Sequence, residues 1–317
     1  MRAEPPVVRY NRSLQISTLD QVAGWVGVEL SPLSDTINRA STMYSCFEIK
    51  KPNGGSRTIR PPNKVLRTLQ HNILRELQSM VRYPRWMMGG IPRRSIFLHA
   101  GPHVAKRMVA TFDVKSFYPS TNSCLVRSVL ERLGFSGEAL DAMVQILIKD
   151  DELPQGGPAS GLIANLALEP ADRRIDAICR KHDLRFTRYV DDIAISGEHD
   201  LRVYQGAIID AIGLCGYEVA PDKIKFMGKE QCQVITKLVV NEQLRPSKSF
   251  IFEVKAKIRE CLANGAFVVA VEHGISVPQL KSKLNGKVSH IKQADQRLGK
   301  SLQRKLNGVN WSRQLPD

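Results

Sequence analysis

The sequence predicts an α+β protein in which helices lie on one face of an antiparallel sheet, and three observations support this class. Of the 317 residues, 43% are apolar, which is too many for a disordered chain and enough to bury the cores of about two domains or lobes. No apolar run approaches the roughly 18 residues of a membrane helix, so we expect a soluble protein. Apolar residues recur with strand and helix periods in the order strand, helices, hairpin, helix and strands.

The first eighty residues predict a helix, a hairpin and a second helix. A short helix within residues 14–30 has Ser17 or Thr18 as its cap. The run FEIKKPNGGSRTIRPPN, residues 47–63, places Asn-Gly-Gly between two short runs that alternate apolar and basic residues, which is typical of a hairpin with cationic arms. Leucine and isoleucine then recur at helical spacing over residues 64–81, so we expect an amphipathic helix there.

The middle of the chain mixes strands and helices. Residues 107–114 (RMVATFDV) predict a buried strand that ends on Asp113. The run LRFTRYVDDIAISG, residues 184–197, predicts two short strands that meet at Asp191 and Asp192. The remaining elements expected in this region are helices at 123–133, 138–149, 161–181 and 201–215, and strands at 224–228 and 234–240.

The last quarter of the chain is predicted to be helical and is strongly basic. The whole chain has 46 Lys plus Arg against 31 Asp plus Glu, a net charge of +15, and the residues from Leu244 onward contribute 14 against 5. A pI near 9.7 indicates a polyanionic partner, because phosphate relieves the mutual repulsion of so many cations. A merely solvated basic surface is the alternative, but the concentration of charge at one end favours a lobe that grips nucleic acid.

The cysteines indicate a reducing compartment. They lie far apart, no CxxC pair occurs, and the N-terminal residues MRAEPPVVRYNRS lack the apolar core of a signal peptide. We therefore expect reduced thiols in a cytoplasmic protein, rather than disulfides or a zinc site. The residues concerned are Cys46, Cys124, Cys179, Cys215, Cys232 and Cys261.

Three carboxylates stand out by their context. Asp113 ends an apolar strand, and Asp191 with Asp192 lies between two further apolar runs. Like charges beside buried strands raise each other's pKa, and a divalent cation removes that cost. An exposed turn is the alternative for the acidic pair, but the apolar flanks and the third acid favour a metal site. Two Mg²⁺ ions on converging carboxylates are the arrangement that nucleotidyl transfer needs.

Four motifs of this chain resemble palm motifs A to D of reverse transcriptases. They are FDVKSFYPS around Asp113, LPQGGPASGLIANL at 153–166, YVDD at 189–192 and GYEVAPDK at 216–223. A single YxDD is moderately specific, whereas four motifs in order over about 110 residues are highly specific. The resemblance implies a right-hand polymerase: an N-terminal helix and fingers at 1–106, a palm with an antiparallel sheet at 107–243, and a basic helical thumb at 244–317.

The resemblance implies roles in metal and sugar binding. Asp113, Asp191 and Asp192, with the backbone carbonyl of Val114, would hold two Mg²⁺ ions. Tyr118 matches the aromatic residue that stacks beneath the incoming sugar and leaves no room for a 2′-hydroxyl, which selects deoxynucleotides. A core aromatic is the alternative for Tyr118.

The resemblance extends to motifs B and D. Gln155 and Gly156 would lie close to the template and the nascent base pair, and Asn165 matches the amide further along the same helix. Lys223 matches the motif D lysine, a candidate general acid for the leaving pyrophosphate, with a solvated lysine as the alternative.

Basic residues outside the palm are expected to contact phosphates. The hairpin resembles the fingers element that clamps the nucleoside triphosphate, so Arg57, with Lys51 or Arg60, would reach the β and γ phosphates. The thumb residues expected to contact RNA are Lys255, Lys281, Lys283 and Lys287.

Within the reverse transcriptases, the chain is similar to the compact bacterial enzymes of retrons. SIFLHAGPH resembles the retron NAxxH element, with Ala100 and His103 in place and His99 where Asn is expected. CQVITKLVVN resembles the retron VTG element, in which Lys237 replaces the glycine. His99 and His103 also form HxxxH, but a metal site there is disfavoured because no third ligand is in sight.

The retron resemblance implies a function and partners. The enzyme would bind its own structured noncoding RNA and extend from the 2′-hydroxyl of an internal guanosine with deoxynucleotides. The product would be a branched RNA–DNA, the multicopy single-stranded DNA of retrons, made in anti-phage defence beside a separately encoded toxic effector. The sequence does not identify the RNA, the priming nucleotide, the cDNA length, the effector or the oligomeric state.

Alternative functions remain open at this point. A non-retron defence-associated reverse transcriptase, or one derived from a group II intron, would use another RNA template and primer. We expect no appended maturase, endonuclease or RNase H region in a chain of 317 residues. A scaffold with a vestigial polymerase site is a further alternative, which the complete set of motif residues disfavours.

Overall fold

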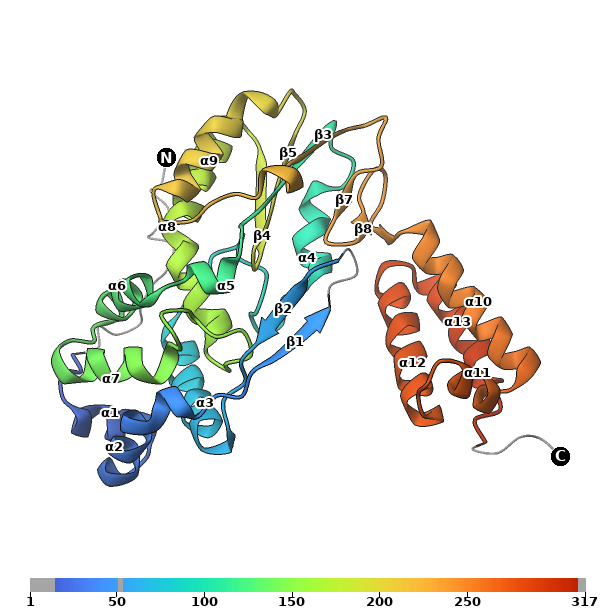
Figure 1. Ribbon diagram of the computed structural model, residues 1–317. Helices are drawn as coiled ribbons and strands as arrows, with labels where there is room; N and C mark the ends of the chain where they lie inside the picture. Colours follow the sequence, from blue (N-terminus) through green and yellow to red (C-terminus); the bar gives the residue numbers. More distant parts are fainter. Residues whose placement is uncertain (1–14, 51–53, 313–317) are drawn as a thin grey trace. The chain divides into compact units, whose positions relative to one another are not determined.

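The computed structural model describes residues 15–50 and 54–312, which form two compact units (Figure 1). One unit contains the described residues up to Ser95 together with Met108–Phe226, and the other contains Ile96–Arg107 together with the described residues from Met227 onward. Each unit has its own apolar core. Helices and antiparallel strands confirm the α+β class. The predicted division into fingers, palm and thumb stays a prediction.

Two short helices begin the first unit, where the sequence predicted one. Helix α1 (Leu19–Val26) is capped by Thr18, and the Thr18 and Gln21 side chains each accept a bond from the other's backbone N–H. The helix ends at Gly27, whose φ of +70° is the left-handed conformation that glycine favours. Helix α2 (Leu30–Arg39) then starts a separate segment.

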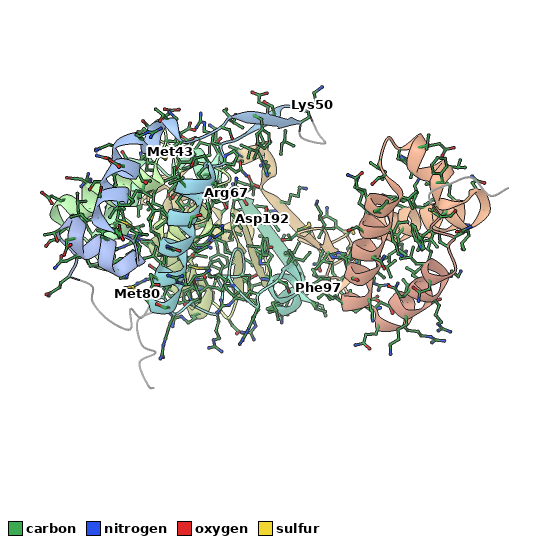
Figure 2. All side chains as sticks on the ribbon, turned by 90° about the horizontal axis from the view of Figure 1, so that it is seen from below. Met43, Lys50, Arg67, Met80, Phe97 and Asp192 are labelled. Atoms are coloured by element: carbon green, nitrogen blue, oxygen red, sulfur yellow. The ribbon has the colours of Figure 1, made fainter. Side chains whose placement is uncertain are left out.

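The predicted hairpin and the helix after it are confirmed. Strands β1 (Phe47–Lys50) and β2 (Ser56–Ile59) pair antiparallel, with Lys50 opposite Ser56. Figure 2 shows Lys50 at the end of this hairpin, and Lys51 lies outside the described residues. Helix α3 (Lys64–Met80) is capped by the side chain of Asn63, which accepts a bond from the Leu66 N–H at 3.0 Å.

A four-stranded sheet follows, with the strand order β4-β5-β3-β6. Strands β3 and β5 pair antiparallel from Met108 opposite Gly197 to Asp113 opposite Asp192, and β4 pairs with the other edge of β5. The middle residues of β3, β4 and β5 are largely buried, as expected for the core strands of such a sheet. The bounds are β3 (Met108–Asp113), β4 (Arg185–Tyr189), β5 (Asp192–Gly197) and β6 (Lys225–Gly228).

The helices predicted from apolar spacing in this region are present, and the short helix α5 was not predicted. Helix α8 packs against β4, α6 and α9, and Figure 1 shows α8 and α9 beside the sheet. Because α8 is buried along most of its length, it carries polar side chains into the core under the strand ends. The bounds are α5 (Phe117–Ser120), α6 (Ser123–Leu133), α7 (Gly137–Leu147), α8 (Ser160–Lys181) and α9 (Gln205–Gly213).

The second unit joins a short segment before β3 to the C-terminal part of the chain. Helix α4 (Ile96–Ala100) continues as a single 3₁₀ turn, Gly101–His103, and the buried rings of His99 and His103 pack with their centroids 6.3 Å apart. The C-terminal part is helical, as predicted. Its helices are α10 (Lys248–Asn264), α11 (Ala266–Glu272), α12 (Val277–Ala294) and α13 (Gln296–Asn307). Across the described ranges, no helix has the length and apolarity needed to cross a membrane.

The strand predicted over residues 234–240 is wrong in its extent. The chain forms a tight hairpin instead, in which Thr236 and Lys237 link β7 (Val234–Ile235) to β8 (Leu238–Val239), and β8 also pairs with β9 (Arg245–Pro246). Both turn residues have positive φ, +44° and +69°, as a two-residue hairpin of type I′ requires. Lys237 therefore adopts a backbone conformation that glycine favours.

Candidate active site

The three predicted carboxylates lie together at the end of β3 and β5. Asp113 is the cross-strand partner of Asp192, and Asp191 lies in the turn just before it. The Val114 N–H donates to the Asp191 carbonyl at 3.2 Å, which ties the turn to the end of β3. Burial raises the pKa of the Asp191 carboxyl and the charge of Asp113 adds to this rise, while Lys223 and Arg57 oppose it. The site is thus an acidic cluster with cations close by.

The turn that carries Asp191 has a strained backbone. Val190 has a φ of +59°, a left-handed conformation that is unusual for a β-branched residue and costs roughly 1–2 kcal/mol. The turn also packs closely on a neighbouring segment, since a Cβ on Gly89 would lie 2.3 Å from the Val190 backbone nitrogen. Contacts elsewhere in the fold must therefore hold this turn in place.

Lys223, the residue that matches motif D, lies beside Asp113, and its predicted role as a general acid stays a prediction. It ends the 3₁₀ turn Pro221–Lys223, and its Nζ donates to Asp113 Oδ1 at 2.6 Å. This hydrogen bond raises the pKa of the Lys223 ammonium. Asp113 thus already accepts one cationic group, and carboxylates are hard oxygen donors that suit a divalent cation. The donor set fits such a cation in its chemistry, although in the described part of the chain no three acidic, His or Cys side chains converge as a finished metal site.

Tyr118 lies between the acids and the start of α8. It belongs to α5, and its Oη would be 3.8 Å from a Cβ on Gly161 in the first turn of α8. Burial raises the pKa of the half-buried Tyr118 hydroxyl, Asp191 raises it further, and Arg57 lowers it. Arg57 of the hairpin and Asp191 of the turn therefore both act electrostatically on Tyr118.

The motif B loop packs against the base of the hairpin. The Gln155 carbonyl accepts a bond from the Arg60 N–H at 2.8 Å. Gly156 has a φ of +121°, and a Cβ there would lie 3.3 Å from Ile59 Cγ2 and 3.3 Å from the Pro61 nitrogen. Glycine is therefore required at this position by the protein's own packing, and the predicted approach of Gly156 to the template stays a prediction.

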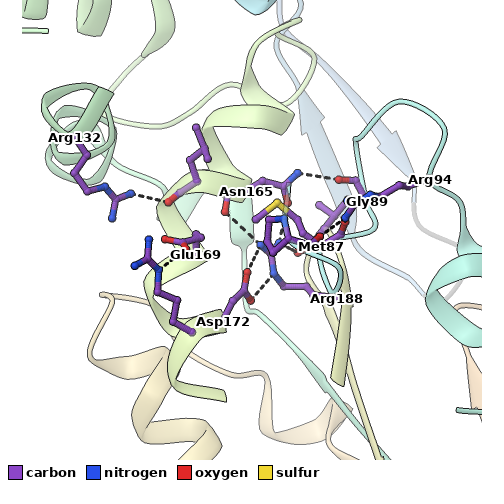
Figure 3. A network of polar contacts seen from close by, with 12 residues as sticks. Met87, Gly89, Arg94, Arg132, Asn165, Glu169, Asp172 and Arg188 are labelled. Carbon is purple, nitrogen blue, oxygen red and sulfur yellow. Dashed lines mark hydrogen bonds and ion pairs between the residues drawn. The ribbon is translucent and has the colours of Figure 1, made fainter. Parts of the chain in front are cut away.

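Sequence reasoning missed Arg188, which bonds to the backbone of the acidic turn at Val190 and whose polar contacts are shown in Figure 3. Its guanidinium is completely buried and holds Asp172 of α8 with two bonds, Nε to Oδ1 at 2.8 Å and Nη2 to Oδ2 at 2.6 Å. It also donates to Asn165 Oδ1 at 2.8 Å and to the Val190 carbonyl at 2.7 Å. Burial raises the pKa of Asp172 to about 6, and Arg188 is the strongest opposing influence.

Asn165 is accordingly a member of this buried network. Its side-chain amide donates to the Gly89 carbonyl at 2.8 Å, while its oxygen accepts from Arg188. The predicted contact of Asn165 with substrate is not tested by this arrangement. The only sequence signal for the network is an arginine inside an otherwise largely buried strand, RFTRY, which demands a buried partner.

The four predicted thumb lysines belong to two helices. Lys255 of α10 is exposed, as are Lys281 and Lys283 of α12. Because α-helical residues four apart share a face, Lys283 and Lys287 lie on one side of α12 and Lys281 on another. Lys281 lies over the ring of Trp311, with Nζ 5.5 Å from its centroid.

A second group of cations lies on α13. Arg297, Lys300 and Arg304 are spaced by three and four residues, so they share one face, and all three are exposed. Within residues 15–50 and 54–312 they form no ion pair, whereas Lys287 pairs with Glu253. This face offers more unpaired positive charge than the predicted lysines of α12.

Acids gathered at the ends of paired strands suit an enzyme that binds divalent cations for nucleotidyl transfer. A family model described as "Reverse transcriptase (RNA-dependent DNA polymerase)" matches residues 49–237, which is more than half of the chain. The chain therefore belongs to the reverse transcriptase family and is an RNA-directed DNA polymerase.

Curated relatives narrow this to the retron type. The retron Mx65 reverse transcriptase of Myxococcus xanthus is 26% identical over 312 residues, which cover 91% of this chain and 71% of the relative. The retron Ec86 reverse transcriptase of Escherichia coli is 26% identical over 236 residues, 73% of this chain and 74% of the relative. The retron Se72 reverse transcriptase of Salmonella heidelberg is 28% identical over 188 residues, 59% of this chain and 50% of the relative.

A solved structure that resembles this one is more distant in sequence. A telomerase from Candida albicans, in complex with a fragment of telomeric RNA, gives a TM-score of 0.46 at 12% identity, covering 82% of this chain and 56% of that chain. At this distance the likeness carries no argument.

Proposed function

We propose that this retron-type polymerase copies part of its own structured noncoding RNA into a branched RNA–DNA product, the multicopy single-stranded DNA of retrons. We place it in the cytoplasm, in an anti-phage defence system whose toxic effector is a separate protein. Similarity to a retron reverse transcriptase over 91% of the chain supports this proposal. The single observation that carries the chemistry is the cross-strand pairing of Asp113 with Asp192, which brings the acids of motifs A and C together.

The acidic cluster holds the catalytic metal in this proposal. Asp113, Asp191, Asp192 and the carbonyl of Val114 would hold two Mg²⁺ ions, which would activate the attacking hydroxyl and stabilise the leaving pyrophosphate. The protein's own part is to keep these oxygens together at the strand ends, where burial first and the charge of Asp113 second raise the pKa of Asp191.

Side chains around the cluster bind and select the nucleotide. The ring of Tyr118, which α5 carries beside the start of α8, blocks the space of a 2′-hydroxyl. Arg57 contacts the triphosphate from the hairpin, and Lys223 Nζ, held at Asp113, donates a proton to the pyrophosphate as it leaves. Gln155 and Gly156 form the surface under the nascent base pair.

The basic helices of the second unit bind the RNA. Affinity for a structured RNA comes mainly from phosphate charge and from the shape of its stems, because the A-form major groove is too narrow for side chains. Exposed cations on α10, α12 and α13 supply that charge in this proposal. They form the predicted thumb, residues 244–317, while residues 1–106 and 107–243 are the fingers and palm.

Sequencing and debranching of the copurified nucleic acid test this function. The full chain is expressed with its own genomic neighbourhood, and DNA bound to the purified protein is treated with debranching enzyme. We expect a single-stranded DNA that is attached through a 2′–5′ bond to a guanosine of one RNA, and that shortens on debranching. DNA without such a branch would contradict the retron product and favour another template and primer.

A further inference from the structure

The strongest unassigned feature of the first unit is the buried guanidinium of Arg188. An arginine side chain has five N–H donors, and here every one of them has an acceptor. Nε and Nη2 bind Asp172, Nη1 binds Asn165 Oδ1 and the Val190 carbonyl, and Nη2 also reaches the Asn165 carbonyl at 3.3 Å. The side chains of Arg188 and Asp172 take no part in the proposed chemistry.

These bonds connect a rigid helix to the strained turn. Asn165 and Asp172 are seven residues apart, so they share the face of α8 that is turned toward the sheet. Both are buried, with 1% and 0% of their surface exposed. The Val190 carbonyl, by contrast, belongs to the residue with left-handed backbone that directly precedes Asp191. Arg188 thus links helix α8 to the peptide group that immediately precedes Asp191 and determines its position.

A second set of contacts closes around the same turn from the other side. Trp86 and Met88 bond to the backbone of Arg188 at 2.7 Å each, which aligns this segment with β4. Its next residue, Gly89, fits against Val190 only because it lacks a side chain, and Asn165 holds the Gly89 carbonyl at 2.8 Å. The turn is therefore enclosed between Gly89 and Arg188, with Asn165 bonded to both.

We propose that Arg188, Asn165 and Asp172 are positioning residues that fix the Tyr189–Asp192 turn, and so place the carboxylates of Asp191 and Asp192 for the reaction. This inference rests on the proposed function of those acids. A purely structural ion pair needs only the bonds between Arg188 and Asp172. The additional bond from Nη1 to the Val190 carbonyl is the one that reaches the acidic turn, and it distinguishes the two roles.

Two variants separate positioning from folding. Arg188→Lys keeps the buried charge opposite Asp172 but loses the planar fork that serves Asp172, Asn165 and Val190 at once. The double variant Arg188→Met with Asp172→Leu removes both charges together, and replacement of a buried pair by apolar groups of similar volume is often neutral for stability. Arg173→Lys is the matched control, because Arg173 pairs with Glu169 on the same helix and has no bond to the turn.

The readouts are single-nucleotide addition on an RNA template, cooperative thermal melting, and hydrogen exchange of the peptide containing residues 189–192. We expect kcat to fall about tenfold in Arg188→Lys and about 10²-fold in the double variant, with KM for the deoxynucleotide changed less than about threefold. Exchange in the 189–192 peptide should accelerate in both variants without metal or nucleotide. Arg173→Lys should match the wild type in every readout.

The outcomes distinguish this inference from the proposed function. Wild-type protein that adds no deoxynucleotide on an RNA template contradicts the function itself. If the wild type is active and both variants fold, but their kcat and the hydrogen exchange of the 189–192 peptide are unchanged, the positioning role alone is overturned. Loss of cooperative melting in both variants also overturns it, because the network would then serve folding rather than the turn.

Discussion

The acidic turn of the first unit and the basic face of α13 in the second use charge in opposite ways. Arg188 below the turn is fully buried, and each of its donors has a fixed partner. Arg297, Lys300 and Arg304 on α13 are exposed. A buried charge with fixed hydrogen-bond partners holds the neighbouring backbone in one conformation. Exposed charges attract phosphate groups up to about one Debye length away, and their flexible side chains adjust to the shape of the bound RNA. Single conservative changes should therefore affect rate at the turn, and total charge should affect affinity at α13.

The largest effect is expected from removal of the acids in the turn. Asp191→Asn with Asp192→Asn should lower primer extension by at least about 10³-fold, because neutral amides bind a divalent cation much more weakly than carboxylates. RNA affinity, measured by filter binding, should stay within about twofold of the wild type. Synthesis at the wild-type rate would show that these acids are not the metal site. A parallel loss of RNA binding would show that the acidic turn also contributes to RNA affinity, against the separation of the two regions.

A smaller effect on selectivity is expected at Tyr118. Tyr118→Ala should raise incorporation of ribonucleotides relative to deoxynucleotides by about 10- to 100-fold, since the ring no longer fills the space of the 2′-hydroxyl. The measurement is kcat/KM for a matched pair such as dGTP and GTP. Tyr118→Phe retains the ring and should keep the wild-type ratio. An unchanged ratio in Tyr118→Ala would assign this residue to the core instead.

The basic face of α13 should respond through affinity and salt alone. Replacing Arg297, Lys300 and Arg304 by Gln should weaken RNA binding about tenfold or more at low salt and flatten the salt dependence by up to about one log–log unit for each lost phosphate contact. The chemical step at saturating RNA should change less than about twofold. Lys257→Gln is the control, because Lys257 already pairs with Glu260 at 2.6 Å. A fall in the single-turnover rate of the α13 variant would contradict the separation of roles.

The smallest effect should distinguish the two sides of α12. Lys283→Gln should lower RNA affinity about two- to threefold, and Lys281→Gln should lower it less, because Lys281 lies over the ring of Trp311. Competition binding with a labelled RNA stem-loop resolves differences of this size. A larger loss in Lys281→Gln would place the RNA on the other side of the helix.

The sequence predicted those features whose signal is local. Strong apolar periodicity located α3, α6 and β3 to within about two residues. The apolar runs around Asp113, Asp191 and Asp192 correctly predicted that these acids lie at neighbouring strand ends. The hairpin at Thr236 and Lys237 was missed because its turn contains neither Gly nor Asn, the residues that usually mark such a loop.

The network around Arg188 could not be predicted for a different reason. Its partners Asp172 and Asn165 are 16 and 23 residues away in the chain, and the segment with Gly89 is nearly 100 residues away. Only packing of α8 and of this segment against β4 brings them together. The need for glycine at position 89 also depends on the fold, because Val190 occupies the space that a Cβ on Gly89 would take.

The most direct test of the account is addition of a single deoxynucleotide by the full chain to a primer on an RNA template, measured for the wild type beside Asp113→Asn. The account predicts rapid addition by the wild type with Mg²⁺, no addition with a chelator, and loss of at least about 10³-fold in the variant. Equal rates for the two proteins, or synthesis that continues without a divalent cation, would contradict it.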